Sequence, residues 1–325
     1  MIEILSNGAP NLIQDLGRAG LLSAGVSRSG AMDNRALSLA NLLIGNAEDA
    51  AGIEISLFPF RLKFLVDTCF ACTGGDCTVR LDDVVLAPWW GRLARAGQTL
   101  VVERPSRGAR AYLALSGGID VPDVLGSRST DLKSTLGGLE GRGLRRGDVL
   151  QLGTQTTKPL GRKGLGLVPD DLPRFWKELS AGSVAVRVLP AAEYDDFTAS
   201  ARASFFESEY QVTLDSNRMG YRLRGEALAL AKPLELFSHG IVPGTIQVPP
   251  NGQPIIQLAE ANTCGGYPKI ATVIDADLWR LAQAPVGSNL SFRLATLEEA
   301  LDARRARIAE LETMRRSLSL MSSRG

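Results

Sequence analysis

The chain of 325 residues is too long for one small hydrophobic core, and its 45% of hydrophobic residues suffices for two domains of ordinary size. Lys and Arg number 36 against 35 Asp and Glu, so the net charge of +1 gives no basic field that would attract nucleic acid or an anionic membrane. Apolar runs stay short of the roughly 20 residues that a spanning helix needs, and Met1 leads into a strand-like segment without a signal-peptide pattern. We therefore expect a soluble, cytoplasmic protein whose partners include no membrane and no nucleic acid.

Short runs rich in Val, Ile, Leu and Phe recur along the whole chain between its 34 glycines and 16 prolines. In chain order they are IEIL, LIQDL, IEISLF, TLVVE, AYLAL, VLQLG, VAVRVLP, YQVTL, TIQV, PIIQLA, ATVI and LSFRL. Many short strands separated by turn residues are typical of barrels and sandwiches. The pattern predicts a mainly β fold with a few helices (α+β).

Two further signals refine this prediction. Asn251 and Gly252 lie between TIQV and PIIQLA and tolerate the positive φ angles of a tight hairpin, so these two strands should pair. Asp33 can cap a helix that stops at Gly45, and Thr296 with Glu299 forms a capping box for a helix over 296–320. The apolar stripe of that last helix is Leu301, Ile308, Leu311 and Leu318, and we expect it to pack on the protein or on a partner.

A change of composition near the middle divides the chain. Residues 153–182 mix Pro, Gly and charge without a clear strand, which is typical of a linker. We expect a first half over 1–155, a linker over 156–182, a second half over 183–295 and a C-terminal helix over 296–320. Each half carries a Ser-x-Arg element after a strand, GSRSTDL and DSNRMGY, which suggests a duplicated barrel.

The four cysteines, Cys69, Cys72, Cys77 and Cys264, are too few for a disulfide scaffold and fit a reducing compartment. The run CFACTGGDC alternates like a strand that turns at two glycines, and a single histidine is present to complete a metal site. We expect buried, small apolar side chains here and assign no metal ligand.

The stretch AEANTCGGYPKIATV (259–273) is unusually polar for a connection between strands. Gly265 and Gly266 would let the backbone approach a ligand closely, Tyr267 supplies a wall with one polar tip, and Lys269 offers a charge for a carboxylate or phosphate. The alternative is a turn that only closes the second half of the fold.

Arginines 18, 128, 142, 218 and 222 lie in polar, glycine-flanked turns. A guanidinium suits bidentate binding of carboxylate or phosphate, but each could instead tie its loop to backbone carbonyls or to a carboxylate such as Asp15, Asp131 or Asp148. We expect Arg218 and Lys269 to share a pocket at one rim of a barrel, where two cations without matching acids would bind an anion.

Two familiar catalytic patterns are missing or weak. No GxxxxGK[ST] loop occurs, and the run GGLEGRG does not open a helix after a strand, so any nucleotide must be held in another way. Ser238 and His239 are adjacent, but neighbouring side chains on an extended segment point to opposite faces. We expect a structural or surface histidine rather than a Ser-His dyad.

Seven stretches together are more specific than any one of them. They are QDLGRAG (14–20), SGAMDNRALSLANLLIGN (29–46), SGGIDVPDVLGSRSTDL (116–132), LGGLEGRGLRRGD (136–148), SNRMGYRLRG (216–225), GIVPGTIQVPPNGQPI (240–255) and TCGGYPKIATV (263–273). In this order they resemble the family of the 5-oxoprolinase C subunit, also called allophanate hydrolase subunit 2 or the biotin-dependent carboxyltransferase-like family, which includes KipA.

The resemblance implies two tandem cyclophilin-like β-barrel domains and a C-terminal helix. It also implies a stable heteromer with a homologue of the 5-oxoprolinase B subunit. In the oxoprolinase system a homologue of the A subunit completes ATP-dependent opening of 5-oxoproline to glutamate, and ATP could then bind to one of these partners. In the related urea carboxylase, similar domains form a carboxyltransferase that uses carboxybiotin, so biotin is expected only under that alternative; the KipA branch is described as a non-catalytic antagonist of a kinase inhibitor.

For a small, polar, anionic substrate we expect catalytic roles for Arg218, Tyr267 and Lys269. The residues expected to bind substrate or nucleotide are Arg128, Asp131, Gln247, Asn262, Gly265 and Gly266. The chain departs from the family's usual pattern at His239, where an acidic residue is typical, and at Glu260, Asn262 and Cys264, where ADxQTTGGYP is common. These departures indicate either a different substrate or a weakened activity.

Overall fold

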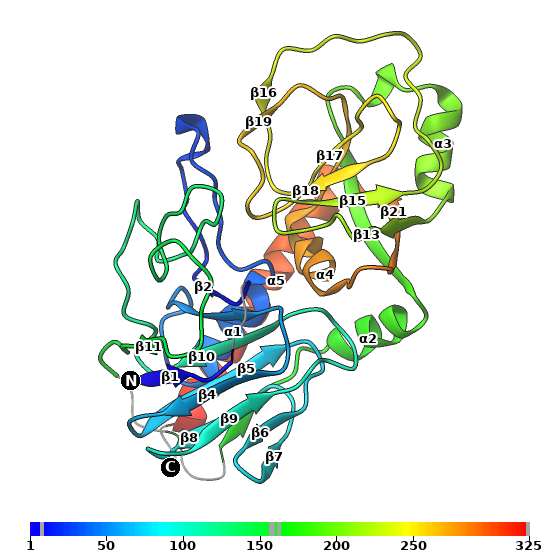
Figure 1. Cartoon of the computed structure of the whole chain (residues 1–325). Coiled ribbons are helices and arrows are strands. Elements are labelled where there is room, and N and C mark those ends of the chain that lie inside the picture. The colour runs from blue at the N-terminus through cyan, green and yellow to red at the C-terminus, as the bar shows by residue number, and fades with distance from the viewer. Residues whose placement is uncertain (7–9, 156–159, 161–163, 323–325) are drawn as a thin grey trace. The chain divides into compact units, whose positions relative to one another are not determined.

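The computed structural model describes residues 1–6, 10–155, 160 and 164–322, and it divides into two compact units. The first unit comprises Met1–Arg18, Ser29–Leu172 and the chain from Glu310 onward, and the second comprises Ala19–Arg28 and Pro173–Ala309. Strands outnumber helices in both units, which confirms the prediction of a mainly β fold with a few helices (Figure 1). No helix in the described part of the chain is long and apolar enough to cross a membrane.

The first unit contains two antiparallel sheets of six strands each. The first has the order β11 (Val149–Leu150), β1 (Ile2–Ile4), β4 (Phe60–Phe64), β9 (Thr99–Val102), β6 (Val79–Leu81) and β7 (Val84–Leu86). The second has the order β12 (Leu165–Gly166), β8 (Trp90–Ala94), β5 (Thr68–Gly74), β10 (Ala111–Leu115), β3 (Gly52–Ile55) and β2 (Leu12–Gln14). Among the described residues, the edge strands are β11 and β7 in the first sheet and β12 and β2 in the second.

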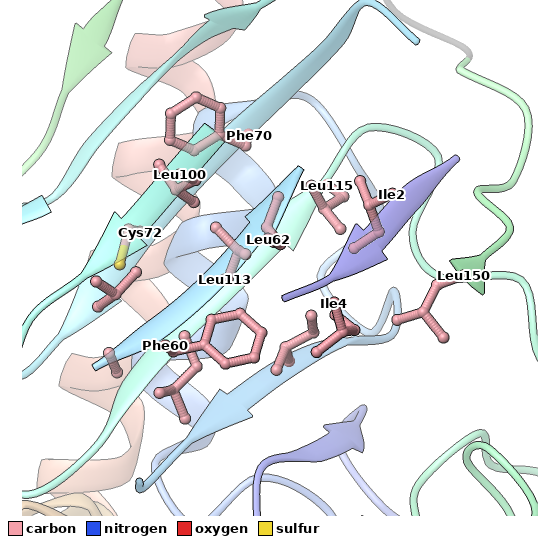
Figure 2. Close-up of a cluster of buried hydrophobic side chains, with 14 of the residues drawn as sticks. Ile2, Ile4, Phe60, Leu62, Phe70, Cys72, Leu100, Leu113, Leu115 and Leu150 are labelled. Carbon is pink, nitrogen blue, oxygen red and sulfur yellow. The ribbon is translucent and has the colours of Figure 1, made fainter. Parts of the chain in front are cut away.

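One hydrophobic core joins these two sheets (Figure 2). In β4 the side chains of Phe60, Leu62 and Phe64 are buried while the intervening Arg61 and Lys63 are exposed, as the period of two in a strand requires. Strands β5 and β10 are buried on both faces, because helix α1 (Asn34–Leu43) packs on them from the other side. Each fully buried large side chain of this kind contributes roughly 1.5–3 kcal/mol to stability.

Helix α1 begins as predicted. The Asp33 carboxylate accepts a hydrogen bond of 2.9 Å from the Ala36 N–H, and Gly45 adopts a left-handed φ of 75° just beyond the last turn. The Thr73 hydroxyl of β5 donates to the Ala36 carbonyl at 2.7 Å and ties the helix to the sheet.

The second unit contains a closed barrel. Its strand order is β13 (Ser183–Pro190), β20 (Lys269–Val273), β17 (Thr245–Gln247), β18 (Ile255–Gln257), β15 (Gly220–Arg224), β14 (Tyr210–Val212) and β21 (Asn289–Leu294). The predicted hairpin is confirmed, since Ile246 of β17 pairs with Ile256 of β18 and Gly252 has a φ of 74° in the turn. A separate ribbon joins β16 (His239–Gly240) to β19 (Cys264–Gly265).

Helices account for the remaining regular structure. They are α2 (Leu172–Ser180), α3 (Ala199–Glu207), α4 (Leu278–Gln283) and α5 (Leu297–Ser322), with short 3-10 turns η1 (Leu22–Ala24), η2 (Tyr194–Asp196) and η3 (Asp275–Asp277). The capping box of α5 is confirmed, because the Thr296 N–H donates to Glu299 at 2.9 Å and the Glu299 N–H donates to the Thr296 hydroxyl at 3.1 Å. Along its stripe Leu318 is buried, whereas Leu301 and Ile308 stay exposed.

The segment expected as a linker is more ordered than its composition indicates. Its last part forms α2, which buries Phe175, Trp176 and Leu179 at helical spacing. Pro173 is compatible with this helix because the first turn needs no N–H donor there. Residues 156–159 and 161–163 of the expected linker lie outside the described residues.

Candidate functional site

The candidate site lies on the outer face of the barrel wall. Ile246 and Ile256 are fully buried and fill the interior, so the neighbouring Gln247 and Gln257 point to the opposite face. The Gln257 amide donates to the Gln247 side-chain oxygen at 3.0 Å, which fixes the orientation of both amides. Gln247 is opposite Lys269 in the adjacent strand β20, which places the lysine on this same wall.

A buried carboxylate neutralises Lys269. The lysine Nζ is 2.9 Å from Oε2 of Glu193, and the lysine backbone N–H donates to the same oxygen at 3.1 Å. Both side chains are about nine-tenths buried, so the pair is largely desolvated. Glu193 immediately precedes η2, where the chain leaves β13.

His239 faces the other oxygen of this carboxylate. Its Nδ1 is 2.9 Å from the Phe237 carbonyl oxygen, which can only accept, so Nδ1 carries the proton in neutral imidazole. Its Nε2 is 3.8 Å from Glu193 Oε1, is buried, and has no hydrogen-bond partner within the described part of the chain. Nε2 is thus positioned to accept a proton, and the resulting cation would be paired with Glu193.

The β16–β19 ribbon covers the wall. Gly265 packs closely on it, because a Cβ at this position would lie 2.5 Å from the Gln247 amide nitrogen and would displace that side chain. That nitrogen also reaches the Tyr267 carbonyl at 3.4 Å, and Tyr267 remains 47% exposed. Residues 259–268 therefore lie outside the barrel wall and lead into β20, and the ribbon brings His239 to the same face as Lys269 and Gln247.

Arg218 does not join this cluster. Arg218 precedes β15, whose first residue Gly220 pairs with Gln257 at the last residue of β18. Lys269 is opposite Gln247, which pairs with the first residue of β18. Arg218 and Lys269 therefore lie at opposite ends of the wall. The Arg218 Nε donates to Glu260 at 2.7 Å, and both side chains are buried. The prediction that Arg218 and Lys269 share a pocket, as two cations without matching acids, is wrong, because each cation has its own carboxylate.

The remaining predicted residues divide between the two units. Asn262 is exposed in the 258–263 turn, and Gly266 packs near Ser238, which immediately precedes β16. Arg128 and Asp131 belong to the first unit: the exposed Arg128 donates to the Val121 carbonyl at 3.0 Å, and the buried Asp131 accepts from the N–H groups of Lys133 and Ser134. Both residues brace their own loop.

The sequence analysis missed Glu193 and Gln257, and it expected His239 to be a structural or surface residue. Glu193 follows a strand in the run AAEYDD, where nothing local distinguishes it from its acidic neighbours. Only the pairing of β13 with β20 brings it to Lys269. Of the cysteines, Cys69, Cys72 and Cys77 are buried as expected, and no group of three or more His, Cys, Asp or Glu in the described residues could hold a metal ion.

The chain thus combines a closed barrel with two antiparallel sheets of six strands. The family described as carboxyltransferase domain, subdomain A and B, matches residues 24–294. The chain belongs to this family, within the group of 5-oxoprolinase C subunits.

Three relatives document this membership. The chain is 44% identical to the 5-oxoprolinase C subunit of Escherichia coli (strain K12) over 304 residues, which is 94% of both chains. It is 42% identical to the 5-oxoprolinase C subunit of Haemophilus influenzae over 316 residues, or 97% of this chain and 98% of that protein. The crystal structure of the K. lactis urea amidolyase superposes with a TM-score of 0.86 at 28% identity, covering 96% of this chain and 20% of that one.

Proposed function

We propose that this protein belongs to an ATP-dependent 5-oxoprolinase, which opens 5-oxoproline to glutamate, and that it acts there with homologues of the B and A subunits. The observation that carries the proposal is the similarity to two proteins named as the C subunit of 5-oxoprolinase over nearly the full length of each. The cluster of the buried Glu193 and Lys269 with the partly exposed His239 supplies groups for proton transfer and for charge stabilisation.

Ring opening breaks the amide C–N bond, adds the oxygen of water to the carbonyl carbon, and transfers a proton to the departing nitrogen. His239 Nε2 is the proposed proton acceptor, because its other nitrogen is fixed by the Phe237 carbonyl. Lys269 and Glu193 hold the charges beside it, and the half-exposed Tyr267 forms the outer wall. We assign Arg218 to bracing the 258–263 turn through Glu260 rather than to catalysis.

We place ATP on a partner protein, since the sequence carries no phosphate-binding loop of the Walker type. The fold similarity to a urea amidolyase supports a second candidate, a carboxyltransferase-type component that takes a carboxyl group from biotin on another domain. The third candidate is a regulatory protein that binds a B-subunit homologue and catalyses no reaction of its own.

The test is ATP hydrolysis by the purified chain mixed with its A-subunit and B-subunit homologues, with and without 5-oxoproline. Stimulation by 5-oxoproline is expected, with at least about a 100-fold loss in the His239→Asn variant, the range for removing a general base. Lys63→Ala, an exposed lysine of β4, is the control and should keep full activity.

A complex that assembles but never responds to 5-oxoproline contradicts the oxoprolinase proposal. Biotin-dependent carboxyl transfer by the same mixture would then favour the second candidate, and assembly without either reaction would favour the third.

A further inference from the structure

The first unit contains a cavity of about 500 Å³, a size that suits a small organic ligand. Three segments of the chain form it, 120–124, 135–141 and 149–151. Its apolar lining side chains are Val121, Pro122, Val124, Leu136, Leu139, Val149 and Leu150. Leu150 also belongs to the core cluster in Figure 2, so one wall of the cavity is rigid.

A glycine-rich loop forms the second wall. Gly137, Gly138 and Gly141 have positive φ angles, and a Cβ on any of them would lie within 2.2 Å of another atom of the unit. Thr135 and Glu140 are also left-handed, with φ angles of 51° and 56°. Since left-handed backbone is uncommon outside glycine, the surrounding structure must hold Thr135 and Glu140 in it, and strained backbone of this kind is common at ligand sites.

The loop presents hydrogen-bond donors. The N–H groups of Leu136, Gly138 and Gly141 bond to backbone carbonyls, whereas those of Thr135, Gly137 and Glu140 have no partner within the described part of the chain. All three residues line the cavity. Backbone N–H groups in turns with alternating helical handedness form concave sites for anions.

A buried positive charge supports this wall from behind. Arg18 is only 1% exposed; its Nε donates to the Val124 carbonyl at 3.1 Å and its Nη2 to the Ser129 carbonyl at 2.8 Å. Its guanidinium packs so closely on Gly137 that a Cβ there would lie 2.5 Å from Nη2. No carboxylate of the described residues forms an ion pair with it, and its Nη1 has no hydrogen-bond partner among them.

The acidic groups near this loop are already engaged or solvated. The Asp15 carboxylate accepts from the hydroxyls of Ser127 and Ser129 and from the N–H groups of Gly17 and Arg128. Glu140 is paired with Arg142 at 3.0 Å, and Asp120 is exposed. The buried Asp131, whose N–H donates to the Leu136 carbonyl, is engaged as well, because its carboxylate accepts from the N–H groups of Lys133 and Ser134. Arg18 is the cation that packs directly on the loop.

The geometry points to a binding site for a small organic carboxylate in this cavity, with the carboxylate on the N–H groups of the glycine-rich loop and the apolar body against the valine and leucine side chains. The choice of 5-oxoproline as the first probe rests on the proposed function, but the site itself rests on the cavity, the donors and Arg18.

The test is a calorimetric titration of the full chain, without ATP or partner proteins, using three probes. The probe 5-oxoproline should bind at least about tenfold more tightly than 2-pyrrolidinone, the same ring without the carboxylate, and than inorganic phosphate, an anion without an apolar body. Equal binding of the three probes, or no binding of 5-oxoproline at tens of millimolar, overturns the inference.

Two valines give a matched pair of variants. Val149 on β11 and Val84 on β7 occupy the two edge strands of the same sheet and are 49% and 51% exposed, but only Val149 lines the cavity. Val149→Trp should fill the cavity and weaken 5-oxoproline binding by at least about tenfold, while Val84→Trp should not; equal melting temperatures would show that both variants fold.

Binding that survives in Val149→Trp but is lost in His239→Asn would place the ligand in the second unit and overturn the inference. This assay measures binding without turnover, so its outcome is independent of the ATPase test. If a carboxylate binds here but 5-oxoproline does not stimulate ATP hydrolysis, the proposed function is contradicted and the binding site is still supported.

Discussion

At the scale of single residues, carboxylates neutralise the cations that the described part of the chain buries most deeply, and Arg18 differs from them. Lys269 is paired with Glu193, Arg218 with Glu260, and Arg35 with Asp171 and Glu310. Removing one partner of a buried pair leaves an uncompensated charge, which costs more than the pair itself contributes. Arg18 is held by backbone carbonyls, and it adjoins the cavity assigned to a carboxylate.

The Lys269–Glu193 pair yields a double-mutant prediction. Lys269→Met and Glu193→Gln should each lower the free energy of unfolding by about 3 kcal/mol, because each leaves the other charge buried alone. The double variant should lose less than the sum, since no lone charge remains. Urea unfolding measures all three.

The control for this cycle is Arg305→Met, which breaks an exposed pair with Asp302 at 2.8 Å and should change stability far less. Strict additivity of the two buried substitutions would show that Glu193 and Lys269 do not interact in solution.

Residue chemistry in the site was only partly predictable from the sequence. Lys269, Gly265 and Tyr267 stand out because charge, glycine and aromatic residues interrupt a strand pattern, and the structure places all three next to Gln247. The sequence could not pair Lys269 with Glu193, 76 residues away, because that contact depends on the order of strands in the barrel. For the same reason it could not tell that Arg218 lies at the other end.

At the scale of elements, the helix caps and the hairpin turn were predictable because they depend on residues that are close in the sequence. The caps of α1 and α5 and the Asn251–Gly252 hairpin follow from residues within a few positions of each other, and all three are confirmed. Helix α2 was missed because Pro173 and the surrounding glycines resemble a linker, while its stability comes from burying Phe175 and Trp176 in tertiary contacts.

An ion pair clamps the glycine-rich loop to β11. Nη1 and Nη2 of Arg142 donate to the two oxygens of Asp148 at 2.9 and 3.0 Å, and the Arg145 N–H donates to the same carboxylate at 2.7 Å. Burial would raise the pKa of Asp148, but the hydrogen bonds from Arg142 and Arg145 outweigh it and hold the pKa below its ordinary value. The clamp joins two walls of the cavity.

The sign of the pH dependence follows. With a pKa that is lower in the folded state, the carboxylate stabilises the fold above its ordinary pKa of 3.8, and this contribution is lost as the pH falls through the lower folded value. Asp148→Asn should therefore cost about 1.5–3 kcal/mol at pH 6, the range for hydrogen bonds to a charged group.

The difference in unfolding free energy between the natural protein and Asp148→Asn should shrink steadily below about pH 4, and urea unfolding between pH 6 and pH 3 measures it. A difference that stays constant over this range would mean that the carboxylate does not titrate with folding.

At the scale of the whole molecule, the proposed function requires partners, and one loop near the barrel-wall site has a surface suited to contact one. Phe237 is 97% exposed, and its carbonyl accepts the hydrogen bond that orients His239. A solvent-exposed aromatic side chain therefore lies two residues before His239, a member of the cluster with Glu193 and Lys269. Exposed aromatic side chains are frequent anchors of protein interfaces. We infer that the B-subunit homologue covers Phe237.

Co-expression with the B-subunit homologue should give co-purification and one peak on size exclusion at micromolar concentration. Phe237→Ser should raise the dissociation constant at least about 30-fold, because losing a buried aromatic anchor costs about 2 kcal/mol or more. Leu214→Ser, at an equally solvated site with 88% exposure, is the matched control and should leave association unchanged. Since neither side chain packs on the chain's own core, both variants should have the same melting temperature as the natural protein. Separate elution of the two natural proteins would contradict a stable heteromer, whereas tight binding that tolerates Phe237→Ser would move the interface away from the cluster.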